Sequence, residues 1–289
     1  MEGSFIDPIN MEKIIEPVTA LKIKKNLERI DAELSLKFIT ENENSKYTEW
    51  EENKRLNRNF IDKGLDSVVI DRLTFCFKEE EVYSTNFFFL FHHNLYFTIP
   101  YIVCKNSKYK GACLIITEKS YDIEMLKKTS KNLGVEIEFI ILDSKGNYLR
   151  KSKAMIKSGY ALFILVDTPF GFNRKTIKKF DYNEKLFGLK YRDGYIKISK
   201  ILNQSPVLLI NDYNFENKIV TTSYKISTSD EVNKIFCARV LSEPEKFEKL
   251  NDFMQLFDFK MKNKTVNFYI DENQYFYNPI DKRLFLKQM

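Results

Sequence analysis

Short apolar runs alternate with more polar, helix-like segments through the middle of the chain. Runs of about four to eight apolar residues bounded by turn residues are typical of buried β-strands. The run 160–167 (YALFILVD) has the clearest pattern of this kind. The expected strands are residues 87–93, 112–117, 135–142, 160–167 and 206–212.

The segments between these runs have the composition and closing residues of helices. A helix over 121–133 is closed by Gly134, one over 148–157 is closed at Gly159, and a third covers 194–203. Residues 95–103 read as a helix or as a loop broken by Pro100. Strands that alternate with helices predict an α/β fold with a mainly parallel central sheet flanked by helices.

Different patterns precede and follow this alternation. Residues 17–71 read as helical, with a charged break over 41–54, and such segments most often cover one face of a sheet. The tail reads as a strand, a helix over 243–257 and a strand over 265–279. No repeat or low-complexity linker divides the chain, so one domain is expected. Its parts are a helical N-terminal region (1–83), a core (84–225) and a C-terminal helix and strand (226–289).

Charge narrows the choice of partners only slightly. The 46 basic and 40 acidic residues give a formal net charge of +6 and are interspersed. This mild excess favours an acidic carrier protein, an anionic membrane surface or a phosphate-bearing substrate. No basic block alternates with a nucleic-acid motif, so nucleic acid is not expected as a partner. The aromatic share of 15% suits either a large core or an apolar ligand groove.

Cysteine spacing and the absence of long apolar segments bear on compartment. The four cysteines show no C-x-x-C spacing and make no standard zinc pattern with the two histidines, so neither a metal nor another cofactor is expected. Cys104 and Cys113 read as reduced core residues, which favours the cytoplasm. The N-terminus lacks the pattern of a secretory signal, and no stretch approaches the roughly 20 apolar residues of a membrane span. A cytoplasmic protein is expected, with peripheral membrane contact as an alternative.

The two histidines of the chain are adjacent, His92 and His93, at the end of an apolar run. Imidazole changes charge near neutral pH, and strand ends are where α/β folds usually place their chemistry. The doublet is therefore a candidate general base. The alternative is that one histidine caps the strand and the other is packed.

A second strand end adds a carboxylate and a basic loop. Asp167 ends the most apolar run, where it is either a turn or helix-capping residue or part of a site shared with the histidines. The loop that follows contains Arg174 among several lysines. It reads either as a solvated basic loop or as a binding lip for an anionic group. Arg174 is the best candidate for that role because its planar fork pairs with carboxylate or phosphate.

The order of these features resembles the lipid A biosynthesis (lauroyl/myristoyl) acyltransferase family, which has the lysophospholipid acyltransferase fold. The resemblance covers roughly residues 70–225. The stretch FFFLFHHNLYFTIP is similar to the family's strand and histidine motif, with His92 on the catalytic histidine and Tyr96 on the aromatic position. The other matching features are Ser158-Gly159, the strand to Asp167, Gly171, Leu186-Phe187-Gly188, Asp193-Gly194 and Ser205-Pro206-Val207.

The resemblance implies an acyltransferase site around the histidines. His92 and His93 are then the catalytic candidates, one as the base and the other orienting it or contacting the thioester. The residues expected to bind substrate are Asn94, Tyr96, Asp167, Arg174, Phe187 and Gly188.

The chain departs from the family at the orienting acid and at the N-terminus. The family has Asp or Glu five positions after the histidine, where this chain has Phe97 (after His92) and Thr98 (after His93). Asp167 or Glu118 could substitute, an amine acceptor could need less base assistance, or the protein could no longer catalyse. The family's membrane-spanning N-terminal segment is replaced by a helical region without such a span.

Two main hypotheses follow. The first is an acyltransferase that moves a fatty acyl group from an acyl carrier protein or coenzyme A thioester to a hydroxyl or amine of a small molecule, lipid or peptide. The second is a non-catalytic relative that binds an acyl chain or acylated carrier as a scaffold or regulator. A third is a peripheral membrane protein that acts on lysophospholipid, which would need an apolar patch with a basic rim.

Overall fold

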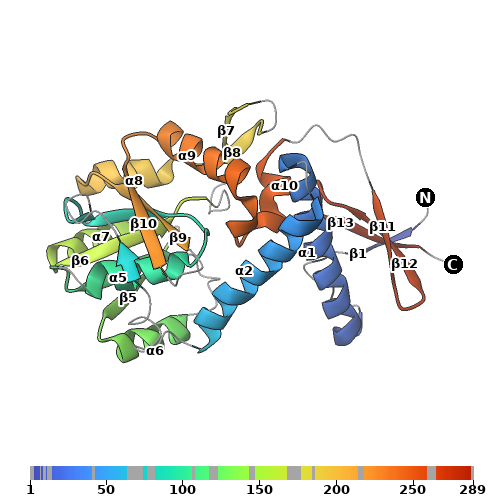
Figure 1. Ribbon diagram of the computed structural model, residues 1–289, viewed down its shortest axis with the longest axis horizontal. Helices are drawn as coiled ribbons and strands as arrows, with labels where there is room; N and C mark the ends of the chain where they lie inside the picture. Colours follow the sequence, from blue (N-terminus) through green and yellow to red (C-terminus); the bar gives the residue numbers. More distant parts are fainter. Residues whose placement is uncertain are drawn as a thin grey trace. The chain divides into compact units, whose positions relative to one another are not determined.

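The structure, a computed structural model, divides into two compact units (Figure 1). Unit 1 comprises Met1–Tyr47, Asp181–Leu189 and Lys249–Met289, and unit 2 comprises Thr48–Phe180 and Lys190–Glu248. The sequence predicts one domain with internal boundaries after residues 83 and 225, and neither boundary coincides with this division. The structure describes residues 3–6, 8, 11, 15–40, 43–63, 74–76, 82–105, 108–116, 123–142, 147–167, 177–183, 186–213, 218–258 and 265–287.

Unit 2 is built on a seven-stranded sheet with the strand order β2-β10-β9-β3-β6-β4-β5. Five neighbouring strands, from β9 to β5, run parallel, while β10 is antiparallel to β9 and β2 is parallel to β10. The predicted α/β class with a mainly parallel sheet is therefore confirmed. The strands are β2 (Thr74–Cys76), β3 (Phe87–Leu90), β4 (Gly111–Ile116), β5 (Glu136–Ile141), β6 (Tyr160–Leu165), β9 (Val207–Tyr213) and β10 (Lys218–Lys225).

Helices connect the parallel strands and cover the sheet. In Figure 1, α8 and α9 lie on one side of the sheet, and α5 and α6 lie on the other. These helices are α5 (Ile99–Lys105), α6 (Ile123–Leu133), α7 (Asn147–Lys157), α8 (Gly194–Leu202) and α9 (Ser229–Ser242). Short 3-10 helices η2 (Tyr96–Thr98) and η4 (Pro244–Lys246) follow β3 and α9, and β7 (Lys178–Phe180) pairs with β8 (Leu189–Tyr191). The long helix α2 (Glu43–Lys63) has residues in both units.

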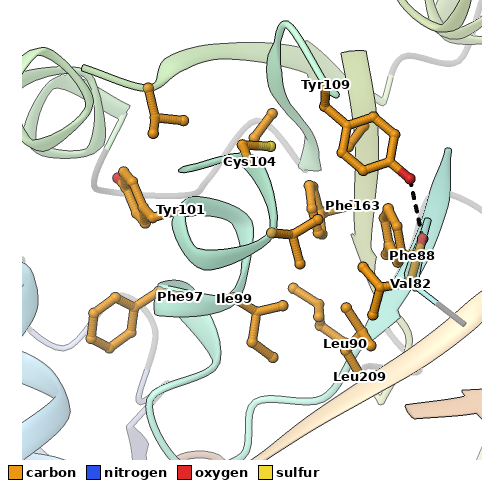
Figure 2. Close-up of a cluster of buried hydrophobic side chains, with 14 of the residues drawn as sticks. Val82, Phe88, Leu90, Phe97, Ile99, Tyr101, Cys104, Tyr109, Phe163 and Leu209 are labelled. Atoms are coloured by element: carbon orange, nitrogen blue, oxygen red, sulfur yellow. Dashed lines mark hydrogen bonds between the residues drawn. The ribbon is translucent and has the colours of Figure 1, made fainter. Parts of the chain in front are cut away.

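One hydrophobic cluster of unit 2 lies between the sheet and α5. Phe88 and Phe163, on neighbouring strands, stack with ring centroids 5.0 Å apart. Figure 2 shows part of this cluster, in which the Tyr109 hydroxyl donates a hydrogen bond to the Val82 carbonyl. Pro100 sits at the second position of α5, where a proline is tolerated because that amide has no partner within the helix. It therefore does not break the helix.

Unit 1 has its own sheet and its own core. The antiparallel order is β1-β13-β12-β11, and the helix α1 packs against η5 and α10. Asp31, buried on α1, accepts hydrogen bonds from the Tyr277 hydroxyl at 3.0 and 2.9 Å and pairs with Lys282. The elements are β1 (Gly3–Ile6), α1 (Pro17–Ile39), η5 (Leu250–Asp252), α10 (Phe253–Leu256), β11 (Val266–Ile270), β12 (Asn273–Asn278) and β13 (Arg283–Lys287).

Three predicted elements differ from the structure. The expected helix over 243–257 is wrong, because α9 ends before Pro244 and short helical turns follow. The expected break over 41–54 is wrong because residues 43–54 lie within α2. The expected single strand over 265–279 is a hairpin of β11 and β12 that turns at Asp271, whose φ is +52°. Of the helical residues expected after this break, 55–63 belong to α2, and 64–71 lie outside the described residues.

Among the described residues, no helix combines the length and the apolar character that a membrane span requires.

Candidate His–Asp site

The parallel pairing of β3 with β6 brings His92 next to Asp167. Leu90 lies opposite Leu165 in the register, and the Val166 amide donates to the Leu90 carbonyl at 3.0 Å. His92 and Asp167 each lie two residues beyond these paired positions. The carboxyl ends of parallel strands meet at one edge of the sheet, so the two side chains share that edge.

His92 makes two hydrogen bonds to the Asp167 carboxylate. Nδ1 of the ring lies 2.8 Å from Oδ1, and the His92 backbone N–H donates to Oδ2 at 2.6 Å. The Asp167 side chain is only 3% exposed, whereas that of His92 is 11% exposed. The carboxylate therefore fixes both the backbone and the ring of the same residue.

This geometry sets the tautomer of the neutral His92 ring. A carboxylate at this position is an acceptor only, so Nδ1 carries the proton and donates it to Asp167. Nε2 is then left with its lone pair and can accept a proton. Among the described residues, Nε2 has no hydrogen-bond partner. His92 thus has the form that a general base requires.

His93 faces the opposite side of the sheet from His92. The His92 ring packs on Tyr96 with centroids 5.0 Å apart, whereas the His93 ring packs on Phe247 at 4.7 Å. Phe91 also contacts Phe247, as expected if the alternation of the strand continues past Leu90. Since the two rings pack against different side chains, the structure gives no support to the prediction that one histidine orients the other.

His93 is 1% exposed and lies 3.2 Å from a carboxylate oxygen of Glu243, measured from Nε2. Neither ring nitrogen of His93 has the geometry of a hydrogen bond. The structure therefore gives His93 a packed position beside an acid and places it apart from the His92–Asp167 pair.

The turn after the histidines has an unusual backbone that buried amides support. Asn94 and Leu95 have positive φ values of +23° and +47°, and Leu95 has no exposed surface. The Leu95 N–H donates to Oδ1 of Asn57 at 3.0 Å, and Nδ2 of Asn211 donates to the Leu95 carbonyl at 3.1 Å. Left-handed backbone at a residue such as leucine is costly unless its surroundings hold it.

Asn211 belongs to a buried polar chain. Its Nδ2 also donates to the Thr98 hydroxyl at 2.9 Å, and its Oδ1 accepts from the Thr221 hydroxyl at 2.7 Å. Asn57 and Asn211 were not among the sequence-based candidates, because a buried asparagine has no short-range sequence signature.

Phe97, at the family's acid position, is a core residue. It is 6% exposed and belongs to the cluster between the sheet and α5 (Figure 2). Tyr96 is half-buried against the His92 ring. A packed phenylalanine therefore stands at the position of the missing acid, and the carboxylate beside His92 comes from the end of the neighbouring strand.

The other predicted site residues lie outside the described residues or in the other unit. Arg174 and Glu118 lie outside the described residues. Phe187 and Gly188 belong to unit 1, where Phe187 is 45% exposed and accepts a hydrogen bond through its carbonyl from the Asp258 amide at 2.9 Å. Gly188 has a φ of +63°, and a Cβ there would lie 2.6 Å from the Asp258 carboxylate. Its role in the structure is conformational.

Metal binding and known relatives give no further assignment. In the part of the chain that the structure describes, no group of three or more His, Cys, Asp or Glu side chains could hold a metal ion. The chain matches no protein-family model and no curated protein sequence. The family resemblance stays a prediction.

Proposed function

We propose that the protein is an acyltransferase in which His92, oriented by Asp167, is the general base. The donor is an acyl carrier protein or coenzyme A thioester, and the acceptor is a hydroxyl or amine. The 2.8 Å contact between His92 Nδ1 and Asp167 Oδ1 carries this proposal. It supplies, from another strand, the carboxylate that the family places five residues after its histidine.

The proposed reaction uses the free nitrogen of His92. Nε2 takes the proton from the hydroxyl or amine of the acceptor, while the oxygen or nitrogen of the acceptor forms a bond to the thioester carbonyl carbon. The carbon–sulfur bond then breaks, and the departing thiolate takes the proton from the imidazolium. Asp167 stabilises the imidazolium and keeps the ring in the required tautomer. General base catalysis of this kind contributes on the order of 10²–10⁴-fold.

The electrostatics and cysteines fit the proposed donors and compartment. A net charge of +6 favours an acidic carrier protein or the phosphates of coenzyme A. Cys104, Cys113 and Cys237 are free and buried, and free thiols suit the reducing cytoplasm. We therefore propose a cytoplasmic location, with peripheral membrane contact as an alternative.

The competing function is a non-catalytic protein that binds an acyl chain or an acylated carrier. The low exposure of the His92 side chain, 11%, is the observation that favours it. In that case the His–Asp pair would only tie the end of β3 to the end of β6.

The test is mass spectrometry of reaction mixtures that contain the purified protein, acyl carrier and coenzyme A thioesters, and a panel of hydroxyl and amine acceptors. We expect one acceptor to gain the mass of the acyl group, and His92→Ala to abolish this gain. Thioesters that are consumed equally by the wild type and by His92→Ala would contradict catalysis by His92. Binding of acylated carrier without transfer would support the competing function.

A further inference from the structure

A second segment of the chain runs along the backbone of the two histidines. The Glu248 amide donates to the His92 carbonyl at 2.8 Å, and the Asn94 amide donates to the Lys246 carbonyl at 3.0 Å. His93 lies opposite Phe247 in this antiparallel bridge. The backbone of residues 92–94 is thus held on both sides of His93 by residues 246–248.

An ion cluster holds this second segment at the end of α9. The Lys246 ammonium lies 2.7 Å from Oε2 of Glu243, and Arg239 binds Oε1 of the same carboxylate at 2.5 Å. The Arg239 guanidinium also makes two parallel hydrogen bonds to Asp212, at 3.0 and 3.1 Å. Asp212 lies on β9, which pairs with β3. The cluster therefore connects α9 to the strand beside the histidines.

His93 adds a third contact to the same carboxylate. Its Nε2 lies 3.2 Å from Oε1 of Glu243, and its ring packs on Phe247. The Glu243 side chain is 13% exposed, so three basic groups converge on a mostly buried carboxylate. Several contacts therefore hold this carboxylate at once, and moving it would break all three of them.

The electrostatics of Glu243 agree with this arrangement. Burial alone would raise the pKa of Glu243, but the contacts with His93, Lys246 and Arg239 outweigh burial and hold the pKa well below its usual range. Glu243 is therefore ionised throughout the neutral range, and the cluster keeps its charge.

We propose that Glu243 is a positioning residue for His92. Glu243 fixes the 246–248 segment and the His93 ring, and these in turn fix the backbone of residues 92–94. In this position His92 contacts Asp167 through its backbone N–H and through Nδ1 of its ring. The catalytic importance of Glu243 rests on the proposed function. Its effect on the His92 ring does not depend on that function and can be measured separately.

Glu243→Gln is the variant that tests this role, since it keeps the size of the side chain and removes the charge. We expect kcat for acyl transfer to fall on the order of tenfold to a hundredfold, with KM changed by less than about twofold, because a misplaced catalytic group costs rate more than binding. The matched control is Thr228→Ala, which removes the hydroxyl that caps the far end of α9 and accepts from the Glu231 amide at 3.3 Å.

The ring of His92 can be observed directly, because the chain has two histidines only. Selective ¹⁵N-histidine labelling gives two sets of ring signals, which His93→Asn assigns. We expect His92 to be protonated on Nδ1 in the neutral wild type and in Thr228→Ala. In Glu243→Gln we expect a mixture of the two tautomers for His92.

Lys246→Met is the second variant if Glu243→Gln fails to fold. It removes the ion pairs of Lys246 with Glu243 and Asp212 and leaves Arg239 on Glu243. It should change the His92 signals in the same direction. Unchanged His92 ring signals in a folded Glu243→Gln or Lys246→Met protein would overturn the positioning role. Equal changes in Thr228→Ala would overturn it too, because they would reduce it to general stability of α9. A wild type without transfer activity would remove the proposed function, while the ring signals would still decide the role of Glu243.

Discussion

Asp167 contacts His92 through both of its carboxylate oxygens, and the two contacts have different consequences. The contact to the ring sets the tautomer, and the contact to the backbone N–H sets the position of the residue. An amide in place of the carboxylate could keep one acceptor oxygen and would lose the charge that stabilises an imidazolium.

Asp167→Asn should therefore remove catalysis with little loss of fold. We expect kcat to fall by a factor on the order of 10³–10⁴, as in the serine-protease case where the orienting aspartate is replaced by asparagine. The measurement is the rate of acyl transfer at saturating thioester, with circular dichroism to check the fold. A folded Asp167→Asn protein with wild-type kcat would contradict the orienting role.

Asp31 is a buried acid in the other unit, where it should make stability depend on pH. Burial raises its pKa from 3.8 to about 6, although Lys282 and Tyr277 act in the opposite direction. Between these pH values the folded protein binds more protons at Asp31 than the unfolded chain does. Its contribution is therefore fully present below pH 3.8 and is lost as the pH rises through about 6.

The loss of stability follows from the rise in the pKa of Asp31 and amounts to about 3 kcal/mol. Asp31→Asn removes this titration. The free energy of unfolding of the wild type should therefore fall by this amount, relative to that of Asp31→Asn, between pH 4 and pH 7. Urea unfolding of both proteins across this range measures the difference. A difference between the two that stays constant with pH would contradict the raised pKa.

Sequence reasoning at the residue scale identified His92 and Asp167 and left their pairing open. The pairing follows from the strand order, because β3 and β6 are neighbours although α5, β4, α6, β5 and α7 separate them in the chain. Strand order depends on long-range packing that no local pattern encodes. The contact between His93 and Glu243 was not predicted for the same reason, since the two residues are 150 positions apart in the chain.

The turn between β3 and α5 depends on side chains from other elements. Asn211 on β9 supports the Leu95 carbonyl, and Asn57 on α2 accepts from the Leu95 amide. These contacts hold the left-handed turn that carries the chain from His92 into the helix.

Asn211→Leu should destabilise unit 2. Leucine has a similar volume and no polar atoms, so the Thr221 hydroxyl would lose its buried acceptor, whereas the Leu95 carbonyl would keep its hydrogen bonds from Thr98. We expect a loss of about 1–3 kcal/mol in the free energy of unfolding, from one unsatisfied buried group. Chemical denaturation measures this loss. The control is Asn26→Leu at a half-buried position on α1. An Asn211→Leu protein as stable as the wild type would show that the amide network is not needed.

The parallel strands and their helices were predictable because each apolar run has the length and turn signals of a strand. The expected helix over 243–257 was wrong because capping residues decide where α9 begins and ends. Thr228 and Glu231 form a capping box that starts α9, and Pro244 prevents the helix from continuing. Helix α2 was missed over 43–54 because its polar composition suggested a break, although Trp50 is buried on it.

The whole molecule contains two compact units, each with its own hydrophobic core. The chain passes between the units several times, so no composition change marks a boundary in the sequence. The sequence therefore predicts the α/β class of unit 2 but not the division itself.

Leu284→Ala tests whether the units lose stability independently. Leu284 lies in the core of unit 1 and has no exposed surface, so truncation should cost about 2–5 kcal/mol there. We expect faster hydrogen exchange in β12 and β13 and unchanged exchange in β4 and β6. A uniform acceleration across both sheets would support the single cooperative domain expected from the sequence.

The His92–Asp167 pair is tested most directly by a double-mutant cycle on kcat for acyl transfer, with His92→Gln, Asp167→Asn and the double variant. If the two residues act as one unit, Asp167→Asn lowers kcat strongly in the wild type and has little further effect once His92 is Gln, as expected for residues that depend on each other. Losses that multiply in the double variant would show that the two residues act separately and would contradict a general base oriented by Asp167.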